Sequence, residues 1–349
     1  MAIYFLFVML LTFFGNSSAR SVHRTPAPQT PILSAQWQKG GTIFQKKDVR
    51  YSEYPLFKTY DHRFFMKHQL PKKTIANLAT PSEAFSGVEL HEILEKLVQE
   101  VKTGKPNLAE FEIIQDKNFN FSMKCGLLVL KFKKFPFVVK LFMETPETFV
   151  YPIWKGFEPV FFFYMSGGAN RHIAGFTRIK NRVYIQKWAA KHPVWKDHIK
   201  IPRKWFWVPK DPDWIAVRGE NISDHVLQTV LPGTYAVVAD YHNEKEDPTL
   251  ATIRKDIIMQ LCNDLNLFID PHDNNFIVTR HSKTSNPFIT VIDTEHFPTI
   301  VGLKEPIQFN NHWDWLYYLA SKMLQDAYFC TKSQRLYTKN AYNALMLTI

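Results

Sequence analysis

Between residues 106 and 145, short apolar runs alternate with polar or basic turns, which is the pattern of consecutive β-strands. The runs are Phe111–Ile114, Leu127–Phe132 and Phe137–Met143. A fourth apolar run, Leu231–Asp240, begins at a Pro-Gly turn. We therefore expect a sheet built from these four segments.

Three other segments have helical periodicity. Thr80–Glu83 is a capping box with proline at the first helical position, and apolar residues then recur at helical spacing until Gly104. Asp247–Pro248 is an N-cap and N1 pair before an apolar face that extends from Leu250 to Leu265. A last amphipathic helix is expected over about Trp313–Phe329.

A β-hairpin is predicted between the second and third helical segments. The apolar runs Phe276–Thr279 and Ile289–Ile292 are separated by the polar loop Arg280–Pro287. Antiparallel pairing places the start of the first strand beside the end of the second. Asn275 and Asp293 should therefore be neighbours.

Oxygen-bearing side chains gather at the mouth of this hairpin. They are Asp270, Asp273, Asn275, Asp293 and Glu295. Carboxylate and amide oxygens are hard ligands that suit Mg²⁺ or Mn²⁺. Taken singly, each of these residues is also a common turn or loop residue.

The order of these residues resembles the protein-kinase-like superfamily. In that family a catalytic aspartate is followed five residues later by an asparagine that opens a strand, and the next strand delivers a metal-binding aspartate. Asp270, Asn275 and Asp293 have that order. The resemblance implies that Asp270 orients the attacking hydroxyl, while Asn275 and Asp293 hold Mg²⁺ or Mn²⁺. Thr294 and Glu295 stand where the family has Phe and Gly.

Lys140, in the run Phe137–Met143, resembles the strand lysine that holds the nucleotide's phosphates in this family. Glu158 is near the expected distance for the ion-pair partner of that lysine, and Glu144 and Glu147 are alternatives. The family's glycine-rich loop is missing, because Asp116–Phe121 contains no glycine. Through Lys140 and Glu158 the resemblance nevertheless implies ATP binding.

The resemblance implies an α+β, two-lobed protein-kinase-like fold with an antiparallel sheet in the N-lobe, a short and mainly helical C-lobe, and an N-terminal extension. Ser166–Arg182 contains adjacent glycines and several basic residues, which indicates a solvated insertion, with a phosphate- or substrate-binding loop as the alternative. The expected divisions are a signal peptide (1–19), a linker and helical extension (20–105), an N-lobe (106–242) with an insertion (165–213), and a C-lobe (243–349).

The N-terminus differs in composition from the rest. Ala2–Phe14 is almost wholly apolar, and the small residues Ser17 and Ala19 follow it. This pattern predicts a cleaved signal peptide and export, with an N-terminal membrane anchor or a buried segment as alternatives. No other stretch is long enough to cross a bilayer, so no transmembrane span is expected in the mature chain.

Composition narrows the classes of partner. A hydrophobic content of 46% excludes wholesale disorder, and three cysteines are too few for a disulfide framework or a zinc cluster. The net charge of +11 favours anionic partners such as phosphates, nucleic acid or an acidic membrane face, unless it serves solubility alone.

Together these features predict a metal-dependent, ATP-dependent phosphotransferase whose acceptor is a protein, a sugar or a lipid. One alternative is a pseudokinase that binds a nucleotide or partner without transfer, which the missing glycine loop suggests. Another is a metal-dependent phosphodiesterase or nuclease, because acidic clusters in basic surroundings also hold two metals. Nucleic acid stays open as a partner but is not favoured. A kinase requires Lys140 to approach the acidic residues, and a nuclease does not.

Overall fold

The structure is a computed structural model that describes residues 43–47, 60–78, 80, 82–104, 107–145, 148, 169–220, 226–244, 246–265, 269, 272–280, 287–295, 313–314 and 317. Several predictions lie outside these ranges: the signal peptide over 1–19, Glu158, Asp270, and all of the expected last helix except Trp313, Asp314 and Tyr317.

Within the described ranges the chain is α+β, as predicted. Its elements are β1 (Ile43–Lys47), α3 (His62–Lys67), β2 (Ile75–Ala76), β3 (Ala84–Phe85), α4 (Gly87–Thr103), β4 (Phe111–Gln115), β5 (Phe119–Asn120), β6 (Cys125–Phe132), β7 (Phe137–Met143), α7 (Ala169–Ala189), β8 (Ile199–Lys200), β9 (Lys204–Trp207), β10 (Trp214–Glu220), β11 (Val226–Pro232), β12 (Thr234–Asp240), the 3₁₀ helix η3 (Pro248–Leu250), α8 (Arg254–Leu265), the 3₁₀ helix η4 (Asp273–Asn275), β13 (Phe276–Arg280) and β14 (Pro287–Val291).

The largest sheet has the strand order β4-β6-β7-β12-β9, with β5 paired to β6, and all of these pairs are antiparallel. The first three apolar runs are confirmed as strands β4, β6 and β7. The fourth run, 231–240, contains the end of β11 and all of β12. Gly233 separates the two strands, and a Cβ there would lie 2.3 Å from the Asp213 carbonyl oxygen, so only glycine fits.

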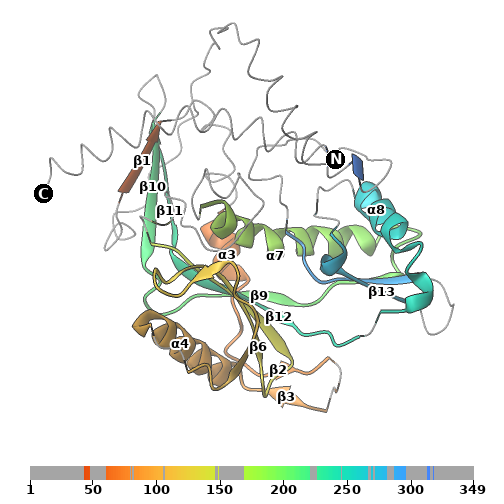
Figure 1. Cartoon of the computed structure of the whole chain (residues 1–349), viewed down its shortest axis with the longest axis horizontal. Helices are drawn as coiled ribbons and strands as arrows, with labels where there is room; N and C mark the ends of the chain where they lie inside the picture. Colours follow the sequence, from red (N-terminus) through yellow and green to blue (C-terminus); the bar gives the residue numbers. More distant parts are fainter. Residues whose placement is uncertain are drawn as a thin grey trace, which may run out of the picture.

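Helices cover both faces of this sheet, with α4 on one side and α7 on the other (Figure 1). Side chains alternate between faces along a strand. In β7, Phe137, Val139 and Leu141 pack with the buried residues of α4. Phe142 instead packs on the α7 side, and Lys140 lies on that same face. The alternation therefore directs Lys140 toward α7.

Helix α4 begins at Gly87, so the prediction that it begins at the capping box Thr80–Glu83 is wrong. Ser86 is its N-cap, and the Ser86 Oγ accepts a hydrogen bond from the Glu89 backbone N at 3.3 Å. Ala84 and Phe85, which precede the cap, form strand β3 instead, and Ala84 pairs with Ala76 of β2. The predicted end is confirmed, because Gly104 adopts the left-handed conformation at φ +79°.

The interpretation of Ser166–Arg182 as a solvated insertion is wrong for the residues that the structure describes. Ala169–Ala189 forms helix α7, and the eight consecutive residues 172–179 are all buried. A helix buried on every side for two turns has no polar face, so it lacks the amphipathic pattern that identifies helices in a sequence. Because β9 also belongs to the largest sheet, the described part of the predicted insertion, residues 169–213, supplies core elements.

Replacing Gly175 with alanine is expected to destabilise the protein by about 1–3 kcal/mol, although alanine is the better helix former. A Cβ at Gly175 would lie 1.9 Å from the Tyr235 hydroxyl oxygen. Tyr235 cannot move aside, because its ring is stacked between Phe142 at 4.8 Å and Phe176 at 4.4 Å. Urea unfolding measures the change. Gln186→Ala on the exposed face of α7 is the control, and equal stabilities would contradict the close packing.

A second core forms where the C-terminal half of α7 meets α8 and the β13–β14 hairpin, which lie together in Figure 1. The hairpin is confirmed, with Phe276 paired to Val291. Asp247 caps η3, its Oδ1 accepting from the Thr249 backbone N at 2.8 Å, and α8 follows only at Arg254. The predicted helix therefore begins later than Pro248. No helix in the described ranges has both the length and the apolar character that a bilayer span requires.

Candidate functional site

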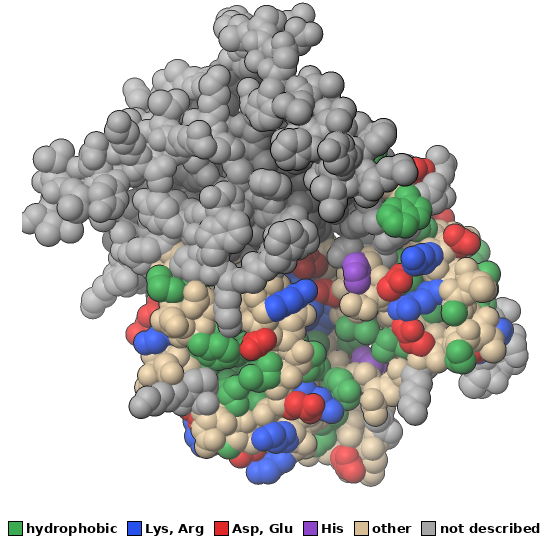
Figure 2. Space-filling model, viewed as in Figure 1, with side chains coloured by type: hydrophobic (Ala, Val, Ile, Leu, Met, Phe, Trp, Pro, Cys, Tyr) green, Lys and Arg blue, Asp and Glu red, His purple; other side chains and the backbone are tan. Residues whose placement is uncertain are grey.

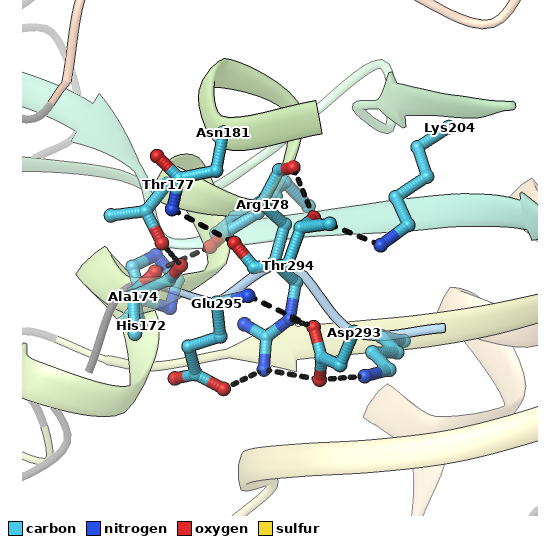
Figure 3. Close-up of polar contacts among 11 residues, drawn as sticks. His172, Ala174, Thr177, Arg178, Asn181, Lys204, Asp293, Thr294 and Glu295 are labelled. Atoms are coloured by element: carbon cyan, nitrogen blue, oxygen red, sulfur yellow. Dashed lines mark hydrogen bonds and ion pairs between the residues drawn. The ribbon is translucent and has the colours of Figure 1, made fainter. Parts of the chain in front are cut away.

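A layer of charged and polar side chains lies along α7, between the core on the α7 face of the large sheet and the core that α7 forms with α8 and the hairpin. Lys140 comes from β7 and Lys204 from β9, on the sheet face that packs against the helix. Arg178 comes from α7 itself. Residues 293–295, which follow β14, extend between these three side chains (Figure 3). The layer thus joins elements that are far apart in the sequence.

Asp293 is the centre of the layer. Its Oδ1 accepts a hydrogen bond from Arg178 Nε at 3.0 Å, and its Oδ2 accepts from Arg178 Nη2 at 3.4 Å. Lys140 Nζ also donates to Oδ2 of Asp293. Arg178 Nη2 pairs in addition with Glu295 Oε2, so the guanidinium bridges two carboxylates (Figure 3). The Arg178 side chain is only 3% exposed, and a charge buried this deeply needs such partners.

Thr294 connects the layer to the helix and to β9. Its Oγ1 accepts a hydrogen bond from Lys204 Nζ at 2.9 Å and donates to the Arg178 carbonyl oxygen at 2.5 Å. The Thr294 carbonyl oxygen accepts from Asn181 Nδ2 at 2.8 Å. Residues 293–295 are therefore each held by a polar contact to a basic residue or to α7.

The charges in this layer shift one another's proton affinities. Burial alone would raise the pKa of Asp293, but the cations of Arg178, Lys140 and Lys204 outweigh it and hold that pKa well below its usual range. Burial would lower the pKa of Arg178, yet Asp293 and Glu295 raise it on balance. The layer thus keeps Asp293 ionised and Arg178 charged.

Lys204 behaves differently. Burial lowers its pKa, Asp293 opposes this, and the neighbouring cations Lys140, Arg178 and Arg182 add to the lowering, so that the pKa falls to about 7. The ammonium group of Lys204 is thus held at a position that disfavours its charge.

Two of the sequence-predicted site residues meet at the mouth of the hairpin, as expected. The Asn275 carbonyl oxygen accepts hydrogen bonds from the backbone N of Ile292 at 2.8 Å and from that of Asp293 at 3.3 Å. Lys140, 153 positions before Asp293 in the chain, contacts the same aspartate. Asp270 and Glu158 fall outside the described residues, so their predicted roles stay predictions.

Asn275 and Asp293 offer an amide and a carboxylate, oxygen donors of the kind that Mg²⁺ and Mn²⁺ prefer. Within the described part of the chain, no three His, Cys, Asp or Glu residues gather into a metal-binding group. Both carboxylate oxygens of Asp293 already accept hydrogen bonds from Lys140 and Arg178. The pair fits a single ion in donor chemistry, provided that the ion replaces one of these contacts.

Sequence reasoning missed the contacts of Lys204 and Thr294, and it placed Arg178 and Asn181 in a solvated insertion. One signal was present for Lys204. In the strand Lys204–Trp207 the lysine lies two residues before Phe206, so both side chains point to the same face of the sheet. Phe206 packs in the core on the α7 side. Arg178 and Asn181 gave no comparable signal, because their helix was not recognised.

Comparison with known proteins found no match among family models, curated proteins or solved structures. The class that the structure defines is an α+β protein with a central antiparallel sheet. Any functional assignment therefore rests on the side chains of the polar layer.

Proposed function

We propose that the chain is an ATP-dependent phosphotransferase related in fold to protein kinases, acting with Mg²⁺ or Mn²⁺ on a protein, sugar or lipid acceptor. The observation that carries the proposal is the contact of Lys140 Nζ with Asp293 Oδ2, beside Asn275. A kinase-like site requires its strand lysine to approach the metal-binding aspartate. A nuclease has no such requirement.

The order of elements supports the same proposal. β4, β6 and β7 are the long strands at the start of the central sheet, and β7, the third, carries Lys140. A helix, α7, is the next described element after this strand. Protein kinases place their lysine on the third strand and follow it with a helix. Helix α8 and the hairpin then come in the order that the resemblance implies.

In this proposal each site residue has a separate role. Lys140 neutralises charge on the phosphates of the nucleotide, and Asp270 orients the acceptor hydroxyl. Asn275 and Asp293 would hold the metal ion, which supplies positive charge against the phosphates when bound. Catalysis then consists of positioning and electrostatic stabilisation, without a covalent intermediate. One departure from the family is that α7 offers a cation, Arg178, to Asp293.

The test is a pair of measurements on the purified chain: a thermal-shift titration with ATP and Mg²⁺ or Mn²⁺, and an assay of ADP release. We expect a metal-dependent shift and turnover. Lys140→Met should lower turnover about 100-fold or more, because a preorganised cation is removed from the site. Asp270→Asn should keep the shift and lose turnover. Lys210→Met, at an exposed lysine, is the charge-matched control. A wild-type protein with neither shift nor turnover would refute the proposal.

One observation favours a second candidate, a pseudokinase that binds without transferring. Both oxygens of Asp293 are engaged by the protein's own cations, so the aspartate is satisfied without a metal ion. The same measurements separate the two candidates. A pseudokinase would give a thermal shift with the nucleotide but no ADP release, and an active enzyme would give both.

A nucleic-acid enzyme finds less support. Figure 2 shows Lys and Arg side chains interspersed with Asp and Glu over the described part of the face in view. Nucleic-acid surfaces concentrate basic residues on one face or along one helix. On this part of the molecule the positive excess of the sequence does not form such a surface.

A further inference from the structure

Lys204 differs from the other two basic side chains of the layer in having no carboxylate partner among the described residues. Lys140 pairs with Asp293, and Arg178 pairs with Asp293 and Glu295. The only hydrogen bond of the Lys204 ammonium within the described ranges goes to the neutral Thr294 hydroxyl. Lys204 is nevertheless 4% exposed. Asp293 is near enough to favour its charge, but no carboxylate of the described residues contacts the Lys204 ammonium group.

The strand register places Lys204 close to the proposed phosphate lysine. Lys140 pairs with Val237 of β12, and Lys204 pairs with Ala239, two residues further on the same strand. Residues two apart share a face, so the two lysines project from one face of the sheet, on strands about 10 Å apart. Their ammonium groups reach adjacent residues, Asp293 and Thr294.

The charges of the layer are unequal. Three basic side chains, Lys140, Arg178 and Lys204, contact residues 293–295, which carry two carboxylates, Asp293 and Glu295. Arg182 is a further cation near Lys204. Arg178 Nη1 is buried and finds no hydrogen-bond partner among the described residues. When Lys140, Arg178, Lys204, Asp293 and Glu295 are all ionised, these five groups carry one positive charge in excess, and one buried N–H donor, Arg178 Nη1, has no acceptor among the described residues. An anion would satisfy both conditions.

From this arrangement we propose that Lys204 is a second phosphate-binding lysine of the site, donating to an oxygen of a polyphosphate ligand beside Lys140. The proposal deepens the phosphotransferase function and rests on it for the nature of the ligand. It gives a reason for a buried lysine that contacts no carboxylate among the described residues. A purely structural lysine would instead support the fold through Thr294, and its removal would leave ligand affinity unchanged.

The experiment measures binding of inorganic tripolyphosphate by calorimetry, in the presence of a chelator so that no metal ion contributes. Wild type, Lys204→Met, Lys204→Gln and Lys210→Met are compared. The two Lys204 variants should bind about 10- to 100-fold more weakly, because each loses a charge-assisted hydrogen bond. Lys210→Met removes the same charge from an exposed position and should bind like wild type. Circular dichroism of each variant establishes that it is folded.

The outcomes separate this proposal from the proposed function. If both Lys204 variants bind within about 2-fold of wild type, the change is well below the loss of a charged hydrogen bond, and Lys204 has no ligand role. The ATP assay alone then decides whether the chain transfers phosphate. If binding depends on Lys204 but no ADP is released with ATP and metal, the anion site stands and phosphotransfer fails. If wild type does not bind tripolyphosphate at all, the role of Lys204 is overturned whatever the ATP assay gives.

Discussion

Replacing Asp293 with alanine should abolish metal-dependent ATP binding and destabilise the folded chain by about 3–5 kcal/mol. Two cations depend on this carboxylate, and the Arg178 side chain is only 3% exposed, so it has no access to water as a substitute partner. Without Asp293, Arg178 keeps only Glu295 as a partner and Lys140 loses its carboxylate, so buried positive charge is left without compensation. The change in the free energy of unfolding is measured by urea denaturation, and nucleotide binding by thermal shift.

A double variant tests whether this loss comes from the positive charge that Asp293 no longer balances. Asp293→Ala combined with Arg178→Met removes the carboxylate together with its most buried partner. Apolar replacements of a buried ion pair are often neutral or stabilising, so the double variant should recover a large part of the stability that Asp293→Ala loses. ATP binding should not recover. If the two substitutions simply add, Arg178 and Asp293 do not act as a pair.

The parts of the fold that local pattern specifies were predicted well from the sequence. The strands over 111–114, 127–132 and 137–143 and the hairpin that follows α8 are confirmed. Register then made one part of the site predictable. In an antiparallel hairpin the start of the first strand lies beside the end of the second. The proximity of Asn275 and Asp293 therefore followed from the predicted ends of the two strands.

Features that depend on tertiary contacts were not predictable in this way. The stretch Ser166–Arg182, which contains the first part of helix α7, was interpreted as a solvated insertion because of its adjacent glycines, Gly167 and Gly168, and its basic residues. In the structure Gly175 is required by the close approach of Tyr235. The start of α4 moved for a related reason, since Ala84 and Phe85 found strand partners in β2. Local signals were overridden by packing in both cases.

The polar layer shows the same limit at the level of chemistry. The sequence predicted acidic ligands and one lysine, which are the residues that the family resemblance names. Partners that hold Asp293 and Thr294 also come from α7 and β9, which are 115 and 90 positions away in the chain. Their roles follow from which face of the sheet each side chain occupies and from the path of α7. Both become known only once the elements are packed together.

Lys204→Met is expected to stabilise the ligand-free chain at pH 6, by a few kcal/mol, while it weakens polyphosphate binding. In the folded chain the pKa of Lys204 is lowered to about 7, from an ordinary value of 10.5 in the unfolded chain. Below pH 7 the lysine is charged in both states, and the folded state bears the full cost of the buried charge. Methionine has a similar length and no charge, so it removes that cost.

The advantage of the variant should shrink as the pH rises. Between pH 7 and 10.5 the unfolded chain binds a proton that the folded chain does not, so the stability of wild type increases with pH in this window relative to the variant. Asp293, Lys140, Arg178 and Arg182 face Lys204 in both proteins, so the difference between the two curves isolates Lys204. Urea unfolding at pH 6 and pH 9.5 measures it, with Lys210→Met as the control. A variant less stable than wild type at pH 6 would mean that Lys204 serves the fold, because a lysine retained for a ligand must cost stability when the ligand is absent.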